Sequence, residues 1–326
     1  MKRNNCECLG ATALVTGGAG YIGSYLVDRL LAMNLNVIVI DDLRQAGVKT
    51  IQHCLHRLSL ETVDVCDARA VARVFEKNRP QTVFHLAALH YIPYCSAHPV
   101  ETLHVNAIGT QIVAECCERF SVDNIFYAST AAVYAPSRRR HGEHAELGPI
   151  DVYGMSKWAG EKAVAQLTRR TGRVVRIGRY FNAVGLRETN PHIIPELISQ
   201  VRAATTGRVD LRLGNLTPRR DYVHASDVAS ASVEVLVRNR SAIFDLVNIG
   251  SGQAYSVEDL VQMISAITGR RMAITQDASQ CRSSDRPFLC ADPGRLTVTY
   301  EYQMKRSLID TLRELFTPFT VPISIA

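Results

Sequence analysis

Tyr153 and Lys157 are the two side chains whose types and spacing most directly suggest chemistry. The surrounding residues, DVYGMSKWAGEKAVAQLTRR, carry apolar side chains at helical spacing, so these two positions emerge on one helix face. An ammonium group beside a phenol favours the phenolate and lowers the pKa of the tyrosine. The pair therefore predicts a proton acceptor at Tyr153, although the same spacing also fits an exposed helix face without chemistry.

A glycine-rich segment lies between a predicted strand and a predicted helix near the start of the chain. The apolar run 11–16 is typical of a buried strand, and Gly17, Gly18, Gly20, Tyr21, Ile22 and Gly23 follow it at once. Glycines here permit a tight turn and let backbone N–H groups approach a pyrophosphate at the start of the helix. The segment therefore predicts a dinucleotide site.

The second predicted strand, 36–40, ends in Asp41 and Asp42. A carboxylate at this position can bind the ribose hydroxyls of NAD and would repel the 2′-phosphate of NADP. Asp41 therefore favours NAD, while the nearby Arg44 keeps NADP open. The alternative for Asp41 is a loop-start residue with no ligand.

Predicted strands and helices continue to alternate through the first half of the chain. Strands are expected at 60–63, 82–86 and 124–128, and helices at 67–78 and 99–120. This alternation predicts an α/β fold with an open, doubly wound parallel sheet that binds ligands at the carboxyl ends of its strands. Further cofactor contacts are expected at Asp64, Val65, Leu86, Ala87, Ala88, Asn106 and Ser129.

The strand–helix alternation stops at about Leu186. Asn190, Pro191 and Pro195 interrupt the pattern, and four further helices are expected at 193–206, 225–238, 256–268 and 306–316. We therefore divide the chain into an NAD-binding Rossmann-type domain, 10–185 with a returning segment near 244–255, and a smaller α/β substrate domain, 186–326. The smaller domain should lie over the strand ends and enclose a ligand.

Composition excludes several classes of function. The 326 residues are 47% apolar and 21% charged, which is ordinary for a globular protein. The net charge of +6 is dispersed, and its densest run, Arg138–Arg140, has no interleaved aromatic residues, so no nucleic-acid site is predicted. No apolar run approaches the roughly 18 residues of a membrane span. A mild positive balance suits an anionic substrate.

The cysteine pattern predicts a location and excludes a metal centre. Nine cysteines, an odd number without a secretory signal, indicate reduced thiols and a cytoplasmic protein. Cys6 and Cys8 have no second pair at zinc-ligand spacing, and His141 and His144 lie in a polar loop. We therefore expect no metal site.

With these residues in place, the chain resembles the extended short-chain dehydrogenase/reductase family, specifically its nucleotide-sugar epimerase branch. The matching stretches keep the family's order over most of the chain: GGAGYIGS at 17–24, DDL at 41–43, HLAA at 85–88, VNAIGT at 105–110, STAAVY at 129–134, YGMSK at 153–157, RYFNAVG at 179–185 and RRDYVHASDVA at 219–229. The resemblance implies bound NAD and a homodimer built from the helix of Tyr153 and the one around 100–119.

The resemblance also implies a role for each matching residue. Tyr153 is expected to be the catalytic base, with Lys157 as its partner and Thr130 as the hydroxyl that binds the sugar O4; a plain strand-edge threonine is the alternative. Tyr180 joins the cofactor contacts. The expected substrate-binding residues are His90, Thr130, Tyr153, Asn182, Arg187, Arg220, Arg282 and Asp285. The guanidinium groups of Arg220 and Arg282 would clamp the diphosphate.

Departures from the family pattern narrow the reaction. Ala131 and Ala132 follow the threonine, where dehydratases of this branch carry Asp-Glu, decarboxylases usually keep a glutamate and GDP-mannose 3,5-epimerases place a cysteine nearby. Among the reactions of this branch, simple C4 epimerization is therefore the one that the residues leave open. His90 replaces a lysine common in galactose-type epimerases, and Leu289 stands where a tyrosine or a smaller residue usually gates the sugar pocket, so the sugar itself stays open.

The expected activity is NAD-dependent inversion of C4 in a UDP-sugar through a 4-keto intermediate. UDP-glucose/UDP-galactose is the first expectation. UDP-glucuronate/UDP-galacturonate is the second, because Arg187 matches an arginine that uronate epimerases place near the C6 carboxylate, although a surface or phosphate role fits it equally. A non-catalytic NAD-binding regulator and a net reductase are the alternatives of other classes; such regulators commonly lose the tyrosine or the lysine.

Overall fold

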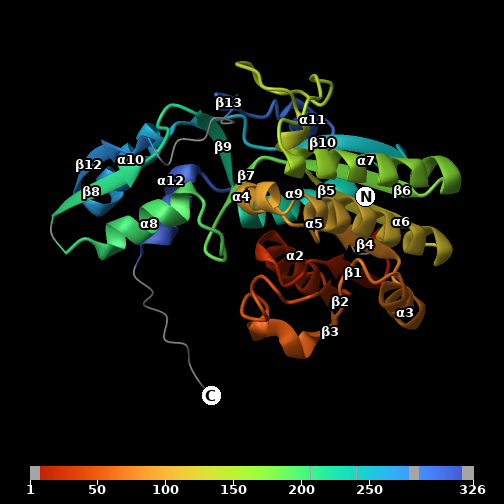
Figure 1. Ribbon diagram of the computed structural model, residues 1–326. Helices are drawn as coiled ribbons and strands as arrows, with labels where there is room; N and C mark the ends of the chain where they lie inside the picture. The colour runs from red at the N-terminus through yellow and green to blue at the C-terminus, as the bar shows by residue number, and fades with distance from the viewer. Residues whose placement is uncertain (1–7, 206, 240, 279–285, 318–326) are drawn as a thin grey trace.

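The computed structural model describes residues 8–205, 207–239, 241–278 and 286–317 (Figure 1). Within these residues, seven parallel strands form one large sheet in the order β10-β6-β5-β4-β1-β2-β3. The strands are β1 (Thr12–Thr16), β2 (Asn36–Asp41), β3 (Leu58–Thr62), β4 (Thr82–His85), β5 (Asn124–Thr130), β6 (Val174–Tyr180) and β10 (Phe244–Ile249). The predicted Rossmann-type α/β fold is therefore confirmed.

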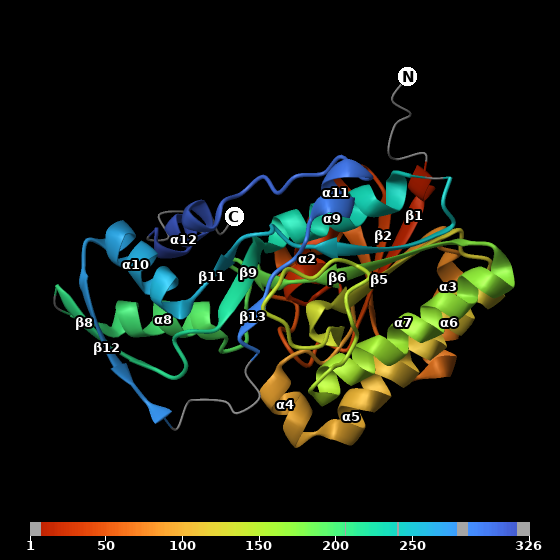
Figure 2. The ribbon, with the colours of Figure 1, turned by 90° about the horizontal axis from the view of Figure 1, so that it is seen from above.

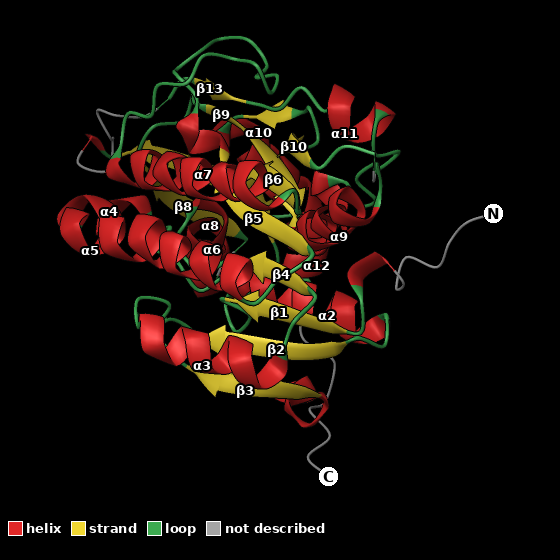
Figure 3. Cartoon of the chain, turned by 90° about the vertical axis from the view of Figure 1, so that its right-hand side faces the viewer, coloured by secondary structure: helices red, strands yellow, loops and turns green. Residues whose placement is uncertain are grey.

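Helices cover both faces of the large sheet (Figure 3). On one face lie α2 (Tyr21–Ala32) and α9 (Ala225–Val237), and on the other lie α3 (Ala68–Asn78), α6 (Gly109–Arg119) and α7 (Val152–Thr171). Successive strand residues alternate between the two cores: Val15 and Val39 join the first, whereas Leu14 and Ile38 join the second. Burial on both faces explains why these strands read as continuous apolar runs.

The single helix expected over 99–120 has three parts in the structure. After α4 (Ile92–Ala97), the chain forms α5 (Pro99–Leu103), a wide π-helical turn (His104–Ile108) and then α6. Asn106 lies in this turn and uses its side chain for contacts outside the helix. A π turn at such a point is a usual way to redirect one side chain without ending the helix.

A smaller lobe stands beside the large sheet (Figure 2). Its core lies between the strand pair β8 (Arg208–Leu213) and β12 (Arg271–Gln276) and three helices, α8 (Ile193–Ala203), α10 (Val257–Thr268) and α12 (Leu308–Phe316). Between the lobes, β9 (Arg219–His224) pairs with β7 (Asn182–Val184), β11 (Ala254–Tyr255) and β13 (Phe288–Leu289).

The lobe boundary differs from the one expected at 185/186. Helix α9 packs on α2 and β6, and α11 (Gly294–Val298) packs on β10, so both lie on the large sheet. Nearly every side of α9 is buried, and such a helix gives no sign in the sequence of the sheet it covers. In the described part of the chain, no helix has both the length and the apolar character needed to cross a membrane.

Candidate active site

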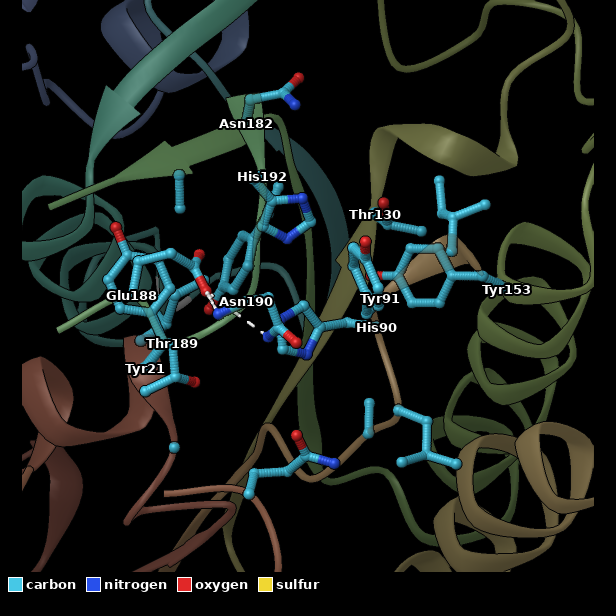
Figure 4. A pocket seen from close by; sticks show the side chains of 18 of the residues that line it. Tyr21, His90, Tyr91, Thr130, Tyr153, Asn182, Glu188, Thr189, Asn190 and His192 are labelled. Carbon is cyan, nitrogen blue, oxygen red and sulfur yellow. Dashed lines mark hydrogen bonds between the residues drawn. The ribbon is translucent and has the colours of Figure 1, made fainter. Parts of the chain in front are cut away.

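A cavity of about 850 Å³ opens at the carboxyl ends of the large sheet's strands, facing the smaller lobe. Figure 4 shows part of its wall, with Thr130 and Tyr153 on one side and Asn182, Glu188 and His192 on the other. Residues of the predicted site that line it are Gly17, Gly20, Tyr21, Ile22, Gly23, Asp41, Asp42, Val65, Leu86, Ala87, Ala88, His90, Ser129, Thr130, Tyr153, Lys157, Tyr180, Asn182 and Arg220.

The glycine loop before α2 has the shape that a dinucleotide requires. A Cβ atom on Gly23 would lie 2.0 Å from the carbonyl oxygen of Gly17, and one on Gly18 would lie 2.7 Å from Val39 Cγ1. The loop therefore folds back on itself and on β2, and side chains larger than hydrogen do not fit. The start of α2, whose first backbone N–H groups have no partner within the helix, then faces the cavity as an anion site.

The end of β2 matches the expectation of NAD rather than NADP. Asp41 lines the cavity and accepts hydrogen bonds from the backbone N–H groups of Ala19 (3.0 Å) and Leu43 (2.9 Å), while burial raises its pKa. Arg44 bonds to Asp42 at 2.5 Å and to Glu101 at 3.3 Å. Arg44 also lines the cavity, but its charge is shared with carboxylates of the protein that would themselves repel a 2′-phosphate.

Helix α7 holds Tyr153 and Lys157 against the end of β5. The Asp151 carboxylate caps the helix by accepting from the Gly154 backbone N–H at 2.7 Å. A Cβ on Gly160 would lie 2.1 Å from the Tyr127 hydroxyl, so only glycine allows this close helix–strand packing. Tyr153, the second residue of the helix, meets the hydroxyl of Thr130 at the end of β5.

The ionisation of the pair differs from the sequence-based expectation. Burial raises the pKa of Tyr153 above its usual value, although a hydrogen bond with Thr130 opposes this. Burial also lowers the pKa of Lys157 to about 7. The expectation that Lys157 lowers the pKa of Tyr153 is wrong for the protein alone, because desolvation of the phenolate dominates and the ammonium is itself destabilised.

Two predicted cofactor residues direct their polar groups into the protein. The Ser129 hydroxyl donates to Glu161 at 2.5 Å, and Glu161 forms a two-bond ion pair with Arg179 at 2.7 and 2.8 Å. The Tyr180 hydroxyl bonds to that of Ser232 at 2.7 Å. Both residues line the cavity, but these contacts position the floor of the site rather than offer hydrogen bonds to a ligand.

Three predicted site residues lie outside the cavity lining. Asn106 is fully buried, and its amide bonds both backbone groups of Leu89 and the hydroxyl of Ser156. Asp64 is exposed and accepts from the Cys66 backbone N–H. Arg187 pairs with the Asp28 carboxylate. These residues direct polar groups to partners within the protein, although the Nη1 atom of Arg187 is buried without a hydrogen-bond partner. Arg282 and Asp285 lie outside the described residues.

The sequence reasoning missed several polar residues of the cavity. Glu188, Asn190 and His192 line it from the segment between β7 and α8, and Asn190 donates to the Nε2 atom of His90 at 3.0 Å. Burial lowers the pKa of His90 and raises that of Glu188. The available signal was their place at the predicted lobe boundary, because connections between lobes commonly line the cleft that the lobes form.

Arg286 is a second kind of omission. Its side chain is only 6% exposed and donates to the backbone carbonyls of Tyr134 (2.6 Å) and Ala132 (2.7 Å). Its own carbonyl accepts from Arg220 at 2.7 Å. Arg286 therefore ties the segment after Thr130 to the strands between the lobes, and its place directly after the expected Asp285 was the signal for it.

The comparisons with known proteins agree with this geometry. Residues 13–250 match the NAD dependent epimerase/dehydratase family. The chain is 30% identical to a UDP-glucose 4-epimerase of Bacillus subtilis over 90% of this chain and 93% of the relative. It is also 30% identical to a probable UDP-arabinose 4-epimerase 3 of Arabidopsis thaliana, over 87% of this chain and 74% of the relative.

A solved structure extends the likeness to the fold. MoeE5 in complex with UDP-glucuronic acid and NAD is 29% identical, with a TM-score of 0.80 over 92% of this chain and 96% of that one. The family match, the glycine loop and the carboxylate at the end of β2 together establish NAD as the cofactor. The chain therefore belongs to the NAD dependent epimerase/dehydratase family, in its nucleotide-sugar epimerase branch.

Proposed function

We propose that this protein is a UDP-sugar 4-epimerase, an isomerase, and that UDP-glucose and UDP-galactose are its favoured pair. The observation that carries the proposal is the placement of Thr130, Tyr153 and Lys157 together on the wall of a cavity that also contains the dinucleotide loop. The names of the two 30% identical relatives, one acting on UDP-glucose and one on UDP-arabinose, support the reaction class.

The residues of the cavity divide the reaction between them. Tyr153 takes the proton of the sugar 4-hydroxyl, either directly or through the Thr130 hydroxyl that it contacts. Bound NAD supplies a hydride acceptor and donor for C4. The resulting 4-keto sugar turns about its diphosphate link, and Tyr153 returns the proton to O4 on the other face.

Lys157 is placed so that its protonation can change together with that of Tyr153. Lys157 lies one helical turn after Tyr153, and its Nζ is 4.2 Å from the centroid of the Tyr127 ring. The side chain has almost no contact with solvent. Because its pKa is about 7, it can hold or release a proton near neutral pH. As the expected ligand of the nicotinamide ribose, it would regain its charge by contact with the bound cofactor and the phenolate.

Binding energy must be concentrated on the diphosphate, because the hexose has to turn. Arg220 and Asn182 line the cavity on the side of the smaller lobe, where they would hold the phosphates. Arg282 and Asp285 keep their proposed roles at the diphosphate and the nucleotide ribose. A firmly held nucleotide beside a loosely held sugar permits hydride return to either face of C4.

A neutral hexose is favoured over a uronate by two placements. Arg187, the residue that suggested a uronate, is paired with Asp28 and does not line the cavity. Glu188 does line it, and a carboxylate there would repel the C6 carboxylate of a uronate. UDP-glucuronate/UDP-galacturonate therefore remains the second candidate, supported by the ligand of MoeE5.

The test is a panel of UDP-sugars offered to the purified protein and followed by NMR for the C4 isomer. A UDP-hexose should give its C4 isomer without added reductant, and faster than UDP-glucuronate does. An NAD-binding regulator would produce no isomer from any sugar. A net reductase would consume NADH in proportion to product. Either result would refute the proposed reaction.

We also propose a homodimer built on α5, α6 and α7. Large apolar side chains are exposed on this surface at Val100, Leu103, Ile108 and Met155, which are 80%, 43%, 50% and 45% exposed. Helices α6 and α7 pack against each other there, so two copies can form a four-helix interface. Leu103→Lys with Ile108→Lys should give a monomer in sedimentation; an unchanged dimer would exclude this surface.

We propose a cytoplasmic location on the basis of the cysteines. Those in the described residues are free thiols, and most of them are buried. Burial raises the pKa of Cys95, Cys116 and Cys117, which keeps these thiols protonated and unreactive. Immunofluorescence of the protein in its own cell, with a secreted control, tests the location.

A further inference from the structure

Three potential metal ligands converge on one side of the cavity. One ligand atom from each of His90, Glu188 and His192 lies within 4.8 Å of the other two. His90 follows β4 of the large sheet, whereas Glu188 and His192 lie between β7 and α8, so the group joins the two lobes. Figure 4 shows the three side chains around the amide of Asn190.

The amide of Asn190 marks the place that a cation would take. Its Nδ2 group donates to His90 Nε2 at 3.0 Å and approaches Glu188 Oε1 at 3.5 Å. A ring N–H of His90 donates to the Ala88 carbonyl, so Nε2 carries the lone pair. A histidine held by a backbone carbonyl through one nitrogen, with the other nitrogen acting as an acceptor, is the usual arrangement of a metal ligand.

We propose that His90, Glu188 and His192 bind a divalent transition-metal ion, and that Zn²⁺ fits this ligand set best. Two imidazoles and one carboxylate form a common three-residue zinc set, with a fourth position left for water or substrate. Zinc bonds of about 2.0–2.2 Å require the three ligand atoms to point at one common position. All three side chains are half-buried at a cavity wall, so side-chain rotation can supply this alignment as the ion displaces the Asn190 amide.

The ion would have two effects on the protein. It would join the loop after β4 to the segment before α8, which raises stability by mass action because only the folded chain brings these ligands together. It would also occupy cavity space on the side opposite Tyr153 and withhold His90 and His192 from a sugar. Inhibition of epimerization by the ion follows, and this second effect rests on the proposed function.

Cobalt binding to the full-length protein tests the site. Co²⁺ reports its coordination by visible absorption, and Zn²⁺ competition gives the relative affinity. We expect one equivalent of Co²⁺ bound through nitrogen and oxygen, without thiolate charge-transfer bands, and a higher melting temperature. His192→Asn and Glu188→Gln should each weaken binding at least about tenfold. His53→Asn is the matched control, because it disrupts the second candidate group found among the described residues, Asp28, His53 and Cys54.

The outcomes separate the site from the reaction. Equal Co²⁺ binding by wild type, His192→Asn and Glu188→Gln would overturn the proposal, as would loss of binding in His53→Asn alone. Absence of stoichiometric binding in the wild type would overturn it too. Specific binding in a protein that epimerizes no sugar would support the metal site and refute the proposed function, so the two can fail independently.

Discussion

Arg187 donates to the Asp28 carboxylate at 2.7 Å, and this ion pair holds the arginine side chain against helix α2 rather than in the cavity. Its guanidinium lies 4.4 Å from the centroid of the Tyr25 ring, a second contact that fixes its orientation. The pair connects the segment after β7 to the first helix of the large sheet. The contact joins the segment before α8 to the large sheet, and we expect the specificity for the sugar to arise from residues that line the cavity.

Arg187→Ala should therefore leave sugar preference unchanged. We expect the ratio of kcat/KM for UDP-glucose to that for UDP-glucuronate to stay within about twofold, because Arg187 does not line the cavity. A tenfold change in this ratio would correspond to about 1.4 kcal/mol of lost differential binding. Stability should fall slightly, since a half-exposed ion pair contributes roughly 0–1 kcal/mol. A selective, tenfold loss for UDP-glucuronate would instead place Arg187 at the C6 carboxylate.

Tyr153→Phe should abolish epimerization while NAD stays bound. Removal of the phenol removes the proton acceptor, and general acid–base groups contribute about 10²–10⁴-fold to rates. Thr130→Val should also reduce turnover, whereas Thr130→Ser should retain it, because serine keeps the hydroxyl that bonds to Tyr153. NMR detection of the C4 isomer gives the rates. Wild-type turnover by Tyr153→Phe would refute its role as base.

The glycine loop and the strand ends could be predicted from the sequence because their chemistry is local. Gly17 to Gly23 must turn tightly directly after β1, and Asp41 ends β2, the strand that pairs in parallel with β1. Parallel strands then bring these local features to a single edge. The placement of Tyr153 beside Thr130 follows from the same rule, since α7 returns the chain from β5 to β6.

Other parts of the site could not be predicted, because they depend on partners far away in the sequence. Asn106 forms its hydrogen bonds with Leu89 and Ser156, and Arg187 pairs with a residue of α2. Neither pairing has a signal in the local pattern. The raised pKa of Tyr153 likewise arises from burial, a property of the whole cavity wall, and outweighs the neighbouring lysine that the helical spacing does reveal.

Lys157 should make the cofactor-free protein more stable as pH rises from about 7 towards 10. Its pKa is about 7 when folded against a usual value of 10.5, so over this interval the unfolded chain holds a proton that the folded chain has released. The contribution of Lys157 to the free energy of unfolding therefore rises with pH, by a few kcal/mol at most. The raised pKa values of the buried thiols Cys95, Cys116 and Cys117 act in the opposite direction at the alkaline end, so this contribution is read as the difference between wild type and Lys157→Met. Urea unfolding at both pH values measures it. The Lys157→Met variant should lack this contribution, whereas a Lys162→Met variant, changed at an exposed lysine, should keep it. Parallel plots of the free energy of unfolding against pH for all three proteins would contradict the prediction.

Asn106→Ala should destabilise the protein rather than selectively weaken NAD binding. The change leaves both backbone groups of Leu89 buried without their partner, at roughly 1–3 kcal/mol for each orphaned group. Asn36→Ala, at an exposed strand end, is the matched control and should change stability little. Thermal unfolding with and without NAD distinguishes a structural role of Asn106 from a role in NAD binding. An unchanged melting temperature with weaker NAD binding would return Asn106 to the cofactor site.

Gly23→Ala should disrupt NAD binding without unfolding the rest of the large sheet. The added methyl would lie 2.0 Å from the Gly17 carbonyl oxygen, and because this oxygen is a backbone atom that cannot rotate away as a side chain can, the loop itself must move. Displacement of the loop misaligns the N–H groups that face the pyrophosphate, so NAD affinity should fall by at least about tenfold, or 1.4 kcal/mol. Gly142→Ala, where the new methyl meets nothing within 4 Å, is the control and should bind NAD normally. Fluorescence titration with NAD measures both. Normal affinity in Gly23→Ala would mean that the loop does not hold the pyrophosphate, and the assignment of the cofactor's position in the cavity would have to be withdrawn.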